Sequence, residues 1–226
     1  MALVQIDNVS KIYQTGEMQV KALQDVTLSI DEASFVTFVG PSGSGKTTML
    51  NLIGCLDKPT KGKVFVDKKQ VDAFDRGQRA AFRGSVLGFI FQAFNLFPVL
   101  TTYENVEYPL VMIKNESASE RNEMVSKVLE SVGMLNQKDK FPDQLSGGQK
   151  QRVAVARALV TQPKLVLADE PTANLDKKSA VNVIRLMRSM RDEFRTTFIF
   201  STHDPGVMEE AEVVHTLEDG RLVRKK

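Results

Sequence analysis

The 226-residue chain has a single cysteine, Cys55, and no long uninterrupted hydrophobic run. A lone cysteine excludes an intrachain disulfide and is typical of a reducing compartment. Because Cys55 closely follows Leu52 and Ile53, we expect a packed thiol that is not a nucleophile. No stretch approaches the roughly 18 consecutive apolar residues of a membrane-spanning helix, so we expect none in this chain.

The sequence also lacks an excess of positive or negative charge. The sequence has 30 basic and 28 acidic residues, a net charge of +2. Dedicated nucleic-acid binders usually show a clear basic excess, so we expect no nucleic-acid partner. The hydrophobic content of 42% and charged content of 26% are ordinary for a folded protein.

The strand and helix patterns predict an α/β fold. Residues 34–39, 164–168 and 196–200 are short apolar runs of the kind found in buried parallel strands. Residues 3–6 and 20–30 alternate apolar and polar side chains, which predicts antiparallel strands. The sequence predicts two more strands, at 63–67 and 88–91, and a hairpin over 213–224. It predicts helices over 46–53, 117–132, 149–160 and 179–194.

A glycine-rich segment follows the strand at 34–39 and precedes the helix at 46–53. Its sequence, Gly-Pro-Ser-Gly-Ser-Gly-Lys-Thr-Thr, is that of a phosphate-binding P-loop. The glycines let backbone amides surround phosphate oxygens, and the helix N-terminus adds partial positive charge. Lys46 is expected to reach the β- and γ-phosphates, and the Thr47 hydroxyl to bind Mg²⁺. The expected nucleotide-binding residues here are Gly40, Pro41, Ser42, Gly43, Ser44, Gly45, Lys46, Thr47 and Thr48.

Two carboxylates, Asp169 and Glu170, follow the predicted strand at 164–168. Asp169 can hold Mg²⁺ directly or through water. Glu170 can face the γ-phosphate and orient or deprotonate the attacking water. An Asp-Glu pair after a strand is unremarkable by itself, but together with the P-loop it indicates nucleotide hydrolysis.

A second candidate phosphate cradle opens the helix near residue 149. Ser146, Gly147, Gly148 and Gln149 place two glycines at a helix start, where backbone amides can bind an anion. A plain N-cap by Ser146 is the alternative, but it leaves both glycines unexplained. One complete P-loop and one separate cradle suggest a site shared between two copies.

Over essentially its whole length the sequence resembles the nucleotide-binding domain of ABC transporters. Residues 40–48 resemble the Walker A motif, 165–169 the Walker B strand and 145–149 the signature motif. The resemblance implies a P-loop NTPase (RecA-like) fold, with a parallel-sheet core, an antiparallel β subdomain and an inserted helical subdomain.

The resemblance also implies the domain limits. One ABC ATPase domain would span 1–226, with 1–92 and 161–226 forming the core and β subdomain. Residues 93–160 would form the helical subdomain that carries the signature motif.

Further site residues are carried over from the resemblance. Tyr13 resembles the aromatic residue that stacks on adenine, and Gln92 the glutamine that senses Mg²⁺ and water. Asn174-Leu-Asp176 resembles the D-loop, with Asp176 at the nucleotide, and His203 the switch histidine that contacts the γ-phosphate. The implied catalytic residues are Lys46, Gln92, Glu170 and His203, the implied metal-binding residues are Thr47, Gln92 and Asp169, and the cofactors are ATP and Mg²⁺.

The implied mechanism is ATP hydrolysis by a head-to-tail dimer with two ATP molecules between the copies. The implied partner is a transmembrane permease subunit with an extracytoplasmic domain, which holds the chain at the cytoplasmic face of the inner (plasma) membrane.

Residues 87–110 narrow the resemblance to lipoprotein-release (Lol-type) and macrolide-efflux (MacB-type) ATPases. This subfamily implies export or mechanotransmission. A regulatory ATPase of the FtsE type, which controls a cell-envelope process without transport, stays open as the alternative. Most of the aromatic residues of 93–110 are expected to fill the core of the helical subdomain. Some are expected to line a groove for a cytoplasmic helix of the permease, with Tyr103 and Glu104 as surface positions there.

Overall fold

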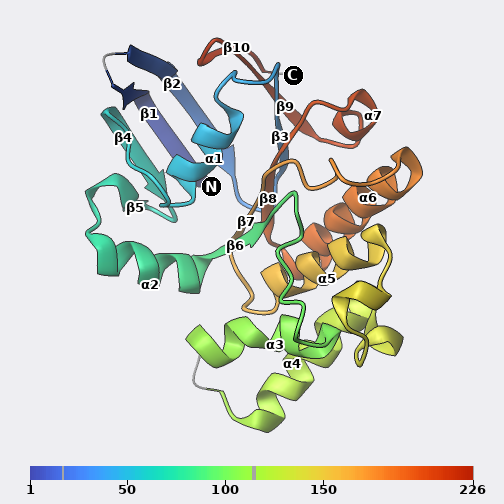
Figure 1. Ribbon diagram of the computed structural model, residues 1–226. Helices are drawn as coiled ribbons and strands as arrows, with labels where there is room; N and C mark the ends of the chain where they lie inside the picture. The colour runs from blue at the N-terminus through green and yellow to red at the C-terminus, as the bar shows by residue number, and fades with distance from the viewer. Residues whose placement is uncertain (17, 114–115, 226) are drawn as a thin grey trace.

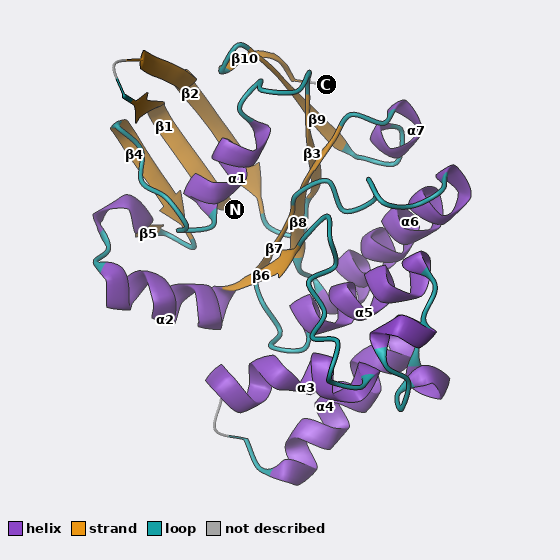
Figure 2. Ribbon diagram, in the orientation of Figure 1, coloured by secondary structure: helices purple, strands orange, loops and turns teal. Residues whose placement is uncertain are grey.

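The computed structural model describes residues 1–16, 18–113 and 116–225, which form two β-sheets and surrounding helices (Figures 1 and 2). The larger sheet is ordered β10 (Arg221–Lys225), β9 (Val213–Glu218), β3 (Phe35–Val39), β8 (Thr197–Thr202), β7 (Leu165–Ala168) and β6 (Leu87–Ile90). The smaller, antiparallel sheet is ordered β2 (Met18–Asp31), β1 (Ala2–Thr15), β4 (Lys61–Val66) and β5 (Lys69–Gln70). In the larger sheet only the β9–β10 hairpin is antiparallel among the strand pairs of the described residues.

Helices cover both faces of the larger sheet. They are α1 (Lys46–Ile53), α2 (Arg76–Val86), α3 (Thr102–Ile113), α4 (Ala118–Ser131), α5 (Gly147–Leu159), α6 (Lys177–Phe194) and α7 (Pro205–Met208). Three short 3₁₀ turns lie at Val71–Ala73, Leu135–Gln137 and Pro142–Gln144. None of the helices in the described part of the chain combines the length and hydropathy that a bilayer-spanning segment requires.

The larger sheet separates two hydrophobic clusters, and its strands contribute to both. Along β7, Leu165 and Leu167 pack with the smaller sheet, α1 and α2, whereas Val166 and Ala168 pack with α3, α4, α5 and α6. This alternation is the two-residue period of a strand that is buried on both faces. The helical segment between β6 and β7 therefore packs on one face of the sheet, opposite α1 (Figure 1).

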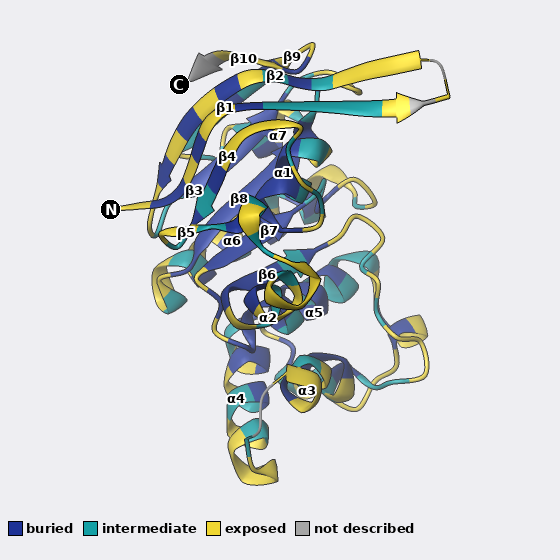
Figure 3. Ribbon diagram, turned by 90° about the vertical axis from the view of Figure 1, so that its left-hand side faces the viewer, coloured by how far each residue is buried: buried dark blue, intermediate teal, exposed yellow. Residues whose placement is uncertain are grey.

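The predicted elements are largely present. Helix α1 has the predicted bounds, and α4 begins with the expected capping box between Ser117 and Glu120. The sequence missed α2, because only Phe82 and Val86 of this Arg- and Gly-containing helix are buried. The strand β1 is longer than predicted, since its pairing with β2 shifts register after Ile6 and this breaks the alternation. Figure 3 shows the central strands β3, β7 and β8 of the larger sheet buried and the far end of the β1–β2 hairpin exposed.

Cys55 lies in the buried core beside α1, with 2% of its surface exposed. Burial raises the pKa of its thiol to about 11, so the thiolate needed for nucleophilic chemistry is scarce at neutral pH. The structure thus agrees with a packed thiol.

Candidate functional site

The loop between β3 and α1 is shaped by glycines that no other residue could replace. Gly40 has a φ of 146°, and a Cβ there would collide with the carbonyl oxygen of Leu217. Gly45 has a φ of 105°, and a Cβ there would lie 2.5 Å from the carbonyl oxygen of Ala22. The chain can therefore bend closely around a bound group only with glycine at these positions.

Lys46, the first residue of α1, is held at the centre of this loop. Its Nζ donates hydrogen bonds to the carbonyl oxygens of Gly40 and Pro41, at 2.8 and 2.9 Å, and only 6% of the residue is exposed. The loop thus curls around the ammonium group and fixes a positive charge at the helix N-terminus, which is a favourable place for a phosphate.

Two hydroxyl groups orient the carboxylate of Asp169, which follows β7. Thr47 Oγ1 lies 2.9 Å from Asp169 Oδ2, and Ser201 Oγ lies 2.6 Å from Oδ1. The structure thus brings together Thr47 and Asp169 from segments 122 residues apart. No cluster of three or more histidine, cysteine or acidic side chains suited to a metal occurs in the described residues. A cation here would have these hard oxygen donors and would need phosphate or water oxygens to complete its shell, as suits Mg²⁺.

Glu170 and His203 are adjacent in space. Glu170 Oε2 lies 2.9 Å from His203 Nδ1, and these residues follow the neighbouring strands β7 and β8. The backbone of Glu170 has a φ of 44°, and its N–H donates to Ser201 Oγ at 2.8 Å. Glu170 is therefore held in a left-handed conformation that turns it away from the strand direction.

Ser201 is a site residue that the sequence analysis did not assign. It is fully buried in β8, and its hydroxyl connects Asp169 to the backbone of Glu170. The available signal was a serine two residues before His203, at the end of a strand whose other residues are mostly apolar.

Gln92 lies in an exposed loop after β6. Its carbonyl oxygen accepts a hydrogen bond from Asn174 Nδ2 at 2.9 Å. Arg157 of α5 donates to the carbonyl oxygens of Phe94 and Asn95, both of which have positive φ. The predicted glutamine loop is therefore fastened to the D-loop on one side and to α5 on the other.

Ser146 is the N-cap of α5, as the alternative interpretation had it. Its Oγ accepts from the N–H of Gln149 at 3.3 Å, and the Gln149 side chain accepts from the N–H of Ser146. The first glycine also has a packing reason, because a Cβ on Gly147 would lie 3.2 Å from Leu175 Cδ2. Beside the cap lies an open hollow of about 470 Å³. Its lining residues come from α5, α6 and the turn after α4 and include Ser146, Gly148, Gln149, Arg152 and Ser179.

The structure does not bring this cap to the P-loop of the same chain. Helix α5 packs in the cluster with α3, α4 and α6, and α1 packs in the cluster on the opposite face of the larger sheet. Figure 1 shows the two helix starts in different parts of the molecule.

The remaining predicted residues flank these centres. Tyr13 interacts with Thr48 of α1, and its hydroxyl donates to Asp57 Oδ2 at 2.8 Å. Asp176 is the N-cap of α6 and accepts from the N–H of Ser179 at 3.0 Å. Hydrogen bonding by the Ser179 side chain, the largest effect, and by its backbone N–H lowers the pKa of the Asp176 carboxyl.

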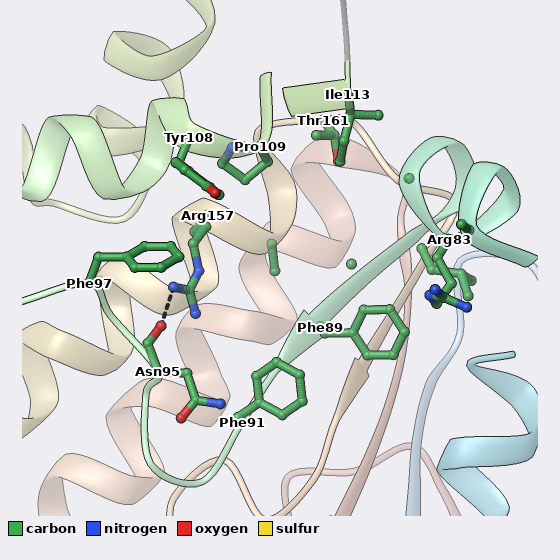
Figure 4. A pocket seen from close by; sticks show the side chains of 15 residues that line it. Arg83, Phe89, Phe91, Asn95, Phe97, Tyr108, Pro109, Ile113, Arg157 and Thr161 are labelled. Atoms are coloured by element: carbon green, nitrogen blue, oxygen red, sulfur yellow. Dashed lines mark hydrogen bonds between the residues drawn. The ribbon is translucent and has the colours of Figure 1, made fainter. Parts of the chain in front are cut away.

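A second hollow, of about 450 Å³, lies between α2, β6, α3 and α5 (Figure 4). We call it the aromatic groove. Its lining is mostly apolar, with two arginines and a few neutral polar side chains, and comprises Ala80, Arg83, Gly84, Leu87, Gly88, Phe89, Phe91, Asn95, Phe97, Tyr108, Pro109, Ile113, Arg157, Ala158 and Thr161. Tyr103 and Glu104 do not line this hollow, and their role at a permease groove stays a prediction. Tyr103 packs on the core under α3, and Glu104 accepts hydrogen bonds from Thr101.

Comparison with known proteins decides the family. The ABC transporter family model matches residues 23–173. An uncharacterized ABC transporter ATP-binding protein of Methanocaldococcus jannaschii, MJ0796, is 43% identical over 99% of this chain and 97% of that protein. The chain belongs to the ABC transporter family. As an ABC protein of this kind it is an ATP-binding and ATP-hydrolysing subunit, which confirms the predicted function, enzyme class and fold class.

The predicted subfamily of this ABC subunit is confirmed as well. The macrolide export protein MacB of Syntrophobacter fumaroxidans is 41% identical over 97% of this chain, which spans 31% of that longer protein. The lipoprotein-releasing system protein LolD of Bordetella pertussis is 40% identical over 97% of this chain and 94% of that protein. A solved dimeric structure of the MJ0796 cassette, bound to ADP and phosphate in a post-hydrolysis state, superposes with a TM-score of 0.88 at 42% identity, covering 99% of this chain and 97% of that one.

Proposed function

We propose that two copies of this chain close around two ATP molecules and that this closure drives a membrane subunit. One observation carries the proposal: α1, which follows the P-loop, and α5, which Ser146 caps, pack on opposite faces of the larger sheet. A nucleotide seated at Lys46 would therefore meet Ser146 only of a second copy. The dimeric ADP- and phosphate-bound cassette of the relative MJ0796 supports this arrangement.

Each nucleotide would be held by one P-loop and by the partner's cap. The backbone amides at the start of α5 and the hollow beside Ser146 offer the second anion site. Because a symmetric dimer uses the same surfaces twice, both sites would be equivalent.

The chemistry of each site follows from the groups around Asp169. Thr47 and Asp169, with Gln92 from the neighbouring loop, would hold Mg²⁺, which neutralises charge on the phosphate oxygens when bound. Glu170 would orient the attacking water and accept its proton, and His203, 2.9 Å from Glu170, would contact the γ-phosphate. Catalysis is then mostly positioning and charge stabilisation.

The aromatic groove is the proposed docking site for a cytoplasmic helix of a permease subunit. Phe97, Tyr108 and Ile113 are 40%, 39% and 50% exposed there, more than large apolar side chains usually are. The permease, with an extracytoplasmic domain, would keep the chain at the cytoplasmic face of the membrane and use closure for export or mechanotransmission. The resemblance to MacB and LolD supports this assignment.

Mixing two inactive variants tests the shared site. Lys46→Ala removes the P-loop charge, and Ser146→Arg blocks the cap, so each variant alone should hydrolyse almost no ATP. In a mixed dimer one site combines an intact P-loop with an intact cap. Random pairing makes half of the dimers mixed, so we expect the mixture to recover roughly a quarter of wild-type hydrolysis. Absence of any recovery in demonstrably mixed dimers would contradict the proposal.

Co-purification with the membrane subunit tests the groove. The ring centroids of Phe97 and Tyr108 lie 4.7 Å apart. If these rings are aromatic anchors that the permease buries, Phe97→Ala or Tyr108→Ala should weaken capture of the permease at least tenfold. Val99→Ala is the matched control, because Val99 is 78% exposed and lies outside the groove. Equal capture by all three variants would count against docking there.

A further inference from the structure

Three side chains beside the P-loop helix form a hydrogen-bonded cluster that we call the Lys11–Tyr13–Asp57 cluster. Lys11 Nζ donates to Asp57 Oδ1 at 2.7 Å, and Tyr13 OH donates to Asp57 Oδ2 at 2.8 Å. The Lys11 ammonium lies 4.7 Å from the centroid of the Tyr13 ring. One carboxylate thus holds both the ring and the cation that lies over it.

The cluster connects the strand that carries Tyr13 to the segment after α1. Lys11 also donates to the carbonyl oxygen of Lys58 at 2.8 Å, and the N–H of Ile12 donates to Thr60 Oγ1 at 3.0 Å. Tyr13 interacts with Thr48 near the other end of α1. The position of the tyrosine ring is therefore tied to both ends of the helix whose N-terminus forms the phosphate cradle.

The charges of the cluster are well defined. Only 12% of the Lys11 side chain and 30% of the Asp57 side chain are exposed, so water screens this pair less than a surface pair. Burial raises the pKa of the Asp57 carboxyl, but hydrogen bonds from Lys11, Lys58 and Tyr13 outweigh it, and the net shift is downward. Asp57 is consequently ionised at neutral pH and fixes the Lys11 ammonium at the ring.

A cation over one face of an aromatic ring leaves only the other face for a flat ligand. The attraction between an ammonium and a tyrosine ring is favourable, so Lys11 and the ring hold each other in place. Because the Tyr13 hydroxyl is bonded to Asp57, rotation of the ring out of this plane would break that bond. The ring is a preformed platform with one accessible face.

We propose that Lys11 and Asp57 are positioning residues that fix the Tyr13 ring as a one-sided platform for a purine base and thereby set the affinity for base-bearing triphosphates. This inference rests on the proposed function and on the role predicted for Tyr13, whose ring would stack on the base of the nucleotide held at Lys46. The hydrogen bonds of the Lys11 and Asp57 side chains join them to each other, to Tyr13 and to Lys58, none of which belongs to the P-loop. Their contribution should therefore appear in nucleotide binding and leave the hydrolytic step unaffected.

Steady-state hydrolysis by Lys11→Met tests the proposal, because methionine keeps an unbranched apolar stem and removes the charge. We expect the KM for ATP to rise roughly three- to tenfold, the range of a partly buried cation–π contact, with kcat within about twofold of wild type. The inhibition constant of inorganic triphosphate, which has no base, should be unchanged. Lys11→Arg should restore most of the loss.

Two further variants distinguish an effect of the cluster on the Tyr13 ring from a general effect of losing a lysine–aspartate pair. Lys164→Met removes another 2.8 Å lysine–aspartate pair, that with Asp67, and should leave the KM for ATP unchanged. Tyr13→Phe keeps the ring under Lys11 but removes the bond to Asp57, so it should raise the KM less than Lys11→Met does. Thermal unfolding midpoints identify any variant that fails to fold.

Two results would overturn the inference. A parallel rise of the ATP KM and the triphosphate inhibition constant in Lys11→Met would mean that the cluster supports the P-loop and not the base. An unchanged ATP KM would mean that it supports neither. Failure of the proposed function itself would be seen separately, as absence of recovered hydrolysis in mixed dimers of Lys46→Ala and Ser146→Arg.

Discussion

Ser201 shows how one buried hydroxyl can order a catalytic centre. Its Oγ lies 2.6 Å from Asp169 and accepts the N–H of Glu170. These bonds fix Asp169, the proposed metal ligand, and Glu170, the candidate base, relative to each other. The Ser201 side chain thereby sets the spacing between Asp169 and Glu170. Their sequence positions alone show only that these two residues are adjacent in the chain.

Ser201→Ala should leave both partners without their hydrogen bond. Because unsatisfied buried polar groups are costly, we expect the variant to lose about 1–3 kcal/mol of unfolding free energy in urea. Its hydrolysis should also need more Mg²⁺ for half-maximal rate, since Asp169 is less well oriented.

Ser189→Ala is the control for this prediction, because Ser189 is exposed and donates only within α6. A Ser201→Ala enzyme with wild-type Mg²⁺ dependence and stability would show that the hydroxyl does not order the centre.

At the scale of elements, two helices carry the same cap in different settings. Ser146 caps α5 and Ser117 caps α4, each accepting from the N–H of the third residue at 3.3 Å. Only the α5 cap carries two glycines and borders an open hollow. Comparing variants of the two serines therefore separates the contribution of an N-cap to stability from a role of Ser146 in nucleotide binding.

Ser146→Ala and Ser117→Ala should each destabilise the chain by about 1 kcal/mol, the usual cost of losing an N-cap. In addition, Ser146→Ala should lose most of its ATP-dependent dimerisation, measured by size exclusion with ATP. Ser117→Ala should dimerise as the wild type does. Equal dimerisation by both variants would leave Ser146 as a cap only.

A bidentate ion pair joins α6 to the residue before β9. Arg191 NH1 and NH2 donate to the two carboxylate oxygens of Glu212, both at 2.7 Å. The hydrogen bonds from Arg191, the largest effect, lower the pKa of Glu212 against the opposing effect of burial. A carboxyl with a lowered pKa stabilises the fold above its ordinary pKa of 4.5, and that contribution is lost as the pH falls below this value.

Glu212→Gln should therefore reduce the unfolding free energy at pH 7 by about 1 kcal/mol, a value already discounted for the exposed third of the side chain. The difference from wild type should shrink as the pH falls below 4.5, which urea unfolding at several pH values can follow. Glu209→Gln, at an exposed position nearby, is the control. A difference that stayed constant down to pH 3 would contradict this account.

Sequence prediction succeeded for elements with strong local signals and failed where tertiary contacts decide. Helix α4 has both a capping box and a stripe of buried Val125, Val128 and Leu129, so its bounds followed from the pattern. Helix α2 has a capping box at Asp75 and Gln78 but only two buried residues, and that stripe was too weak to find. Its position beside the aromatic groove depends on packing against β6, which no local pattern encodes.

On the scale of the whole molecule, the sequence predicted the parts of the site better than their arrangement. The P-loop, Asp169 and Glu170 could be identified because their chemistry needs fixed residue types at fixed spacings. The packing of α1 and α5 on opposite faces of the larger sheet could not, since it follows from strand order and from which face each helix covers. That arrangement is the reason we propose a site completed by a second molecule.

The same distinction applies to the aromatic residues of α3. The aromatic-rich segment led us to expect Tyr103 and Glu104 at the surface, and Glu104 is exposed. In the helix α3, however, Tyr103 turns toward the core and Tyr108 turns toward the groove. A helical segment presents different faces every few residues, so the composition of the segment did not reveal which aromatic residues remain accessible.

The most direct test of the account is a crystal structure of Glu170→Gln trapped with ATP and Mg²⁺. We expect a dimer in which Ser146 Oγ of one protomer lies about 2.7–3.2 Å from a terminal phosphoryl oxygen of the ATP that Lys46 of its partner holds. An ATP-bound structure in which Ser146 faces solvent, far from any γ-phosphate, would contradict the shared site.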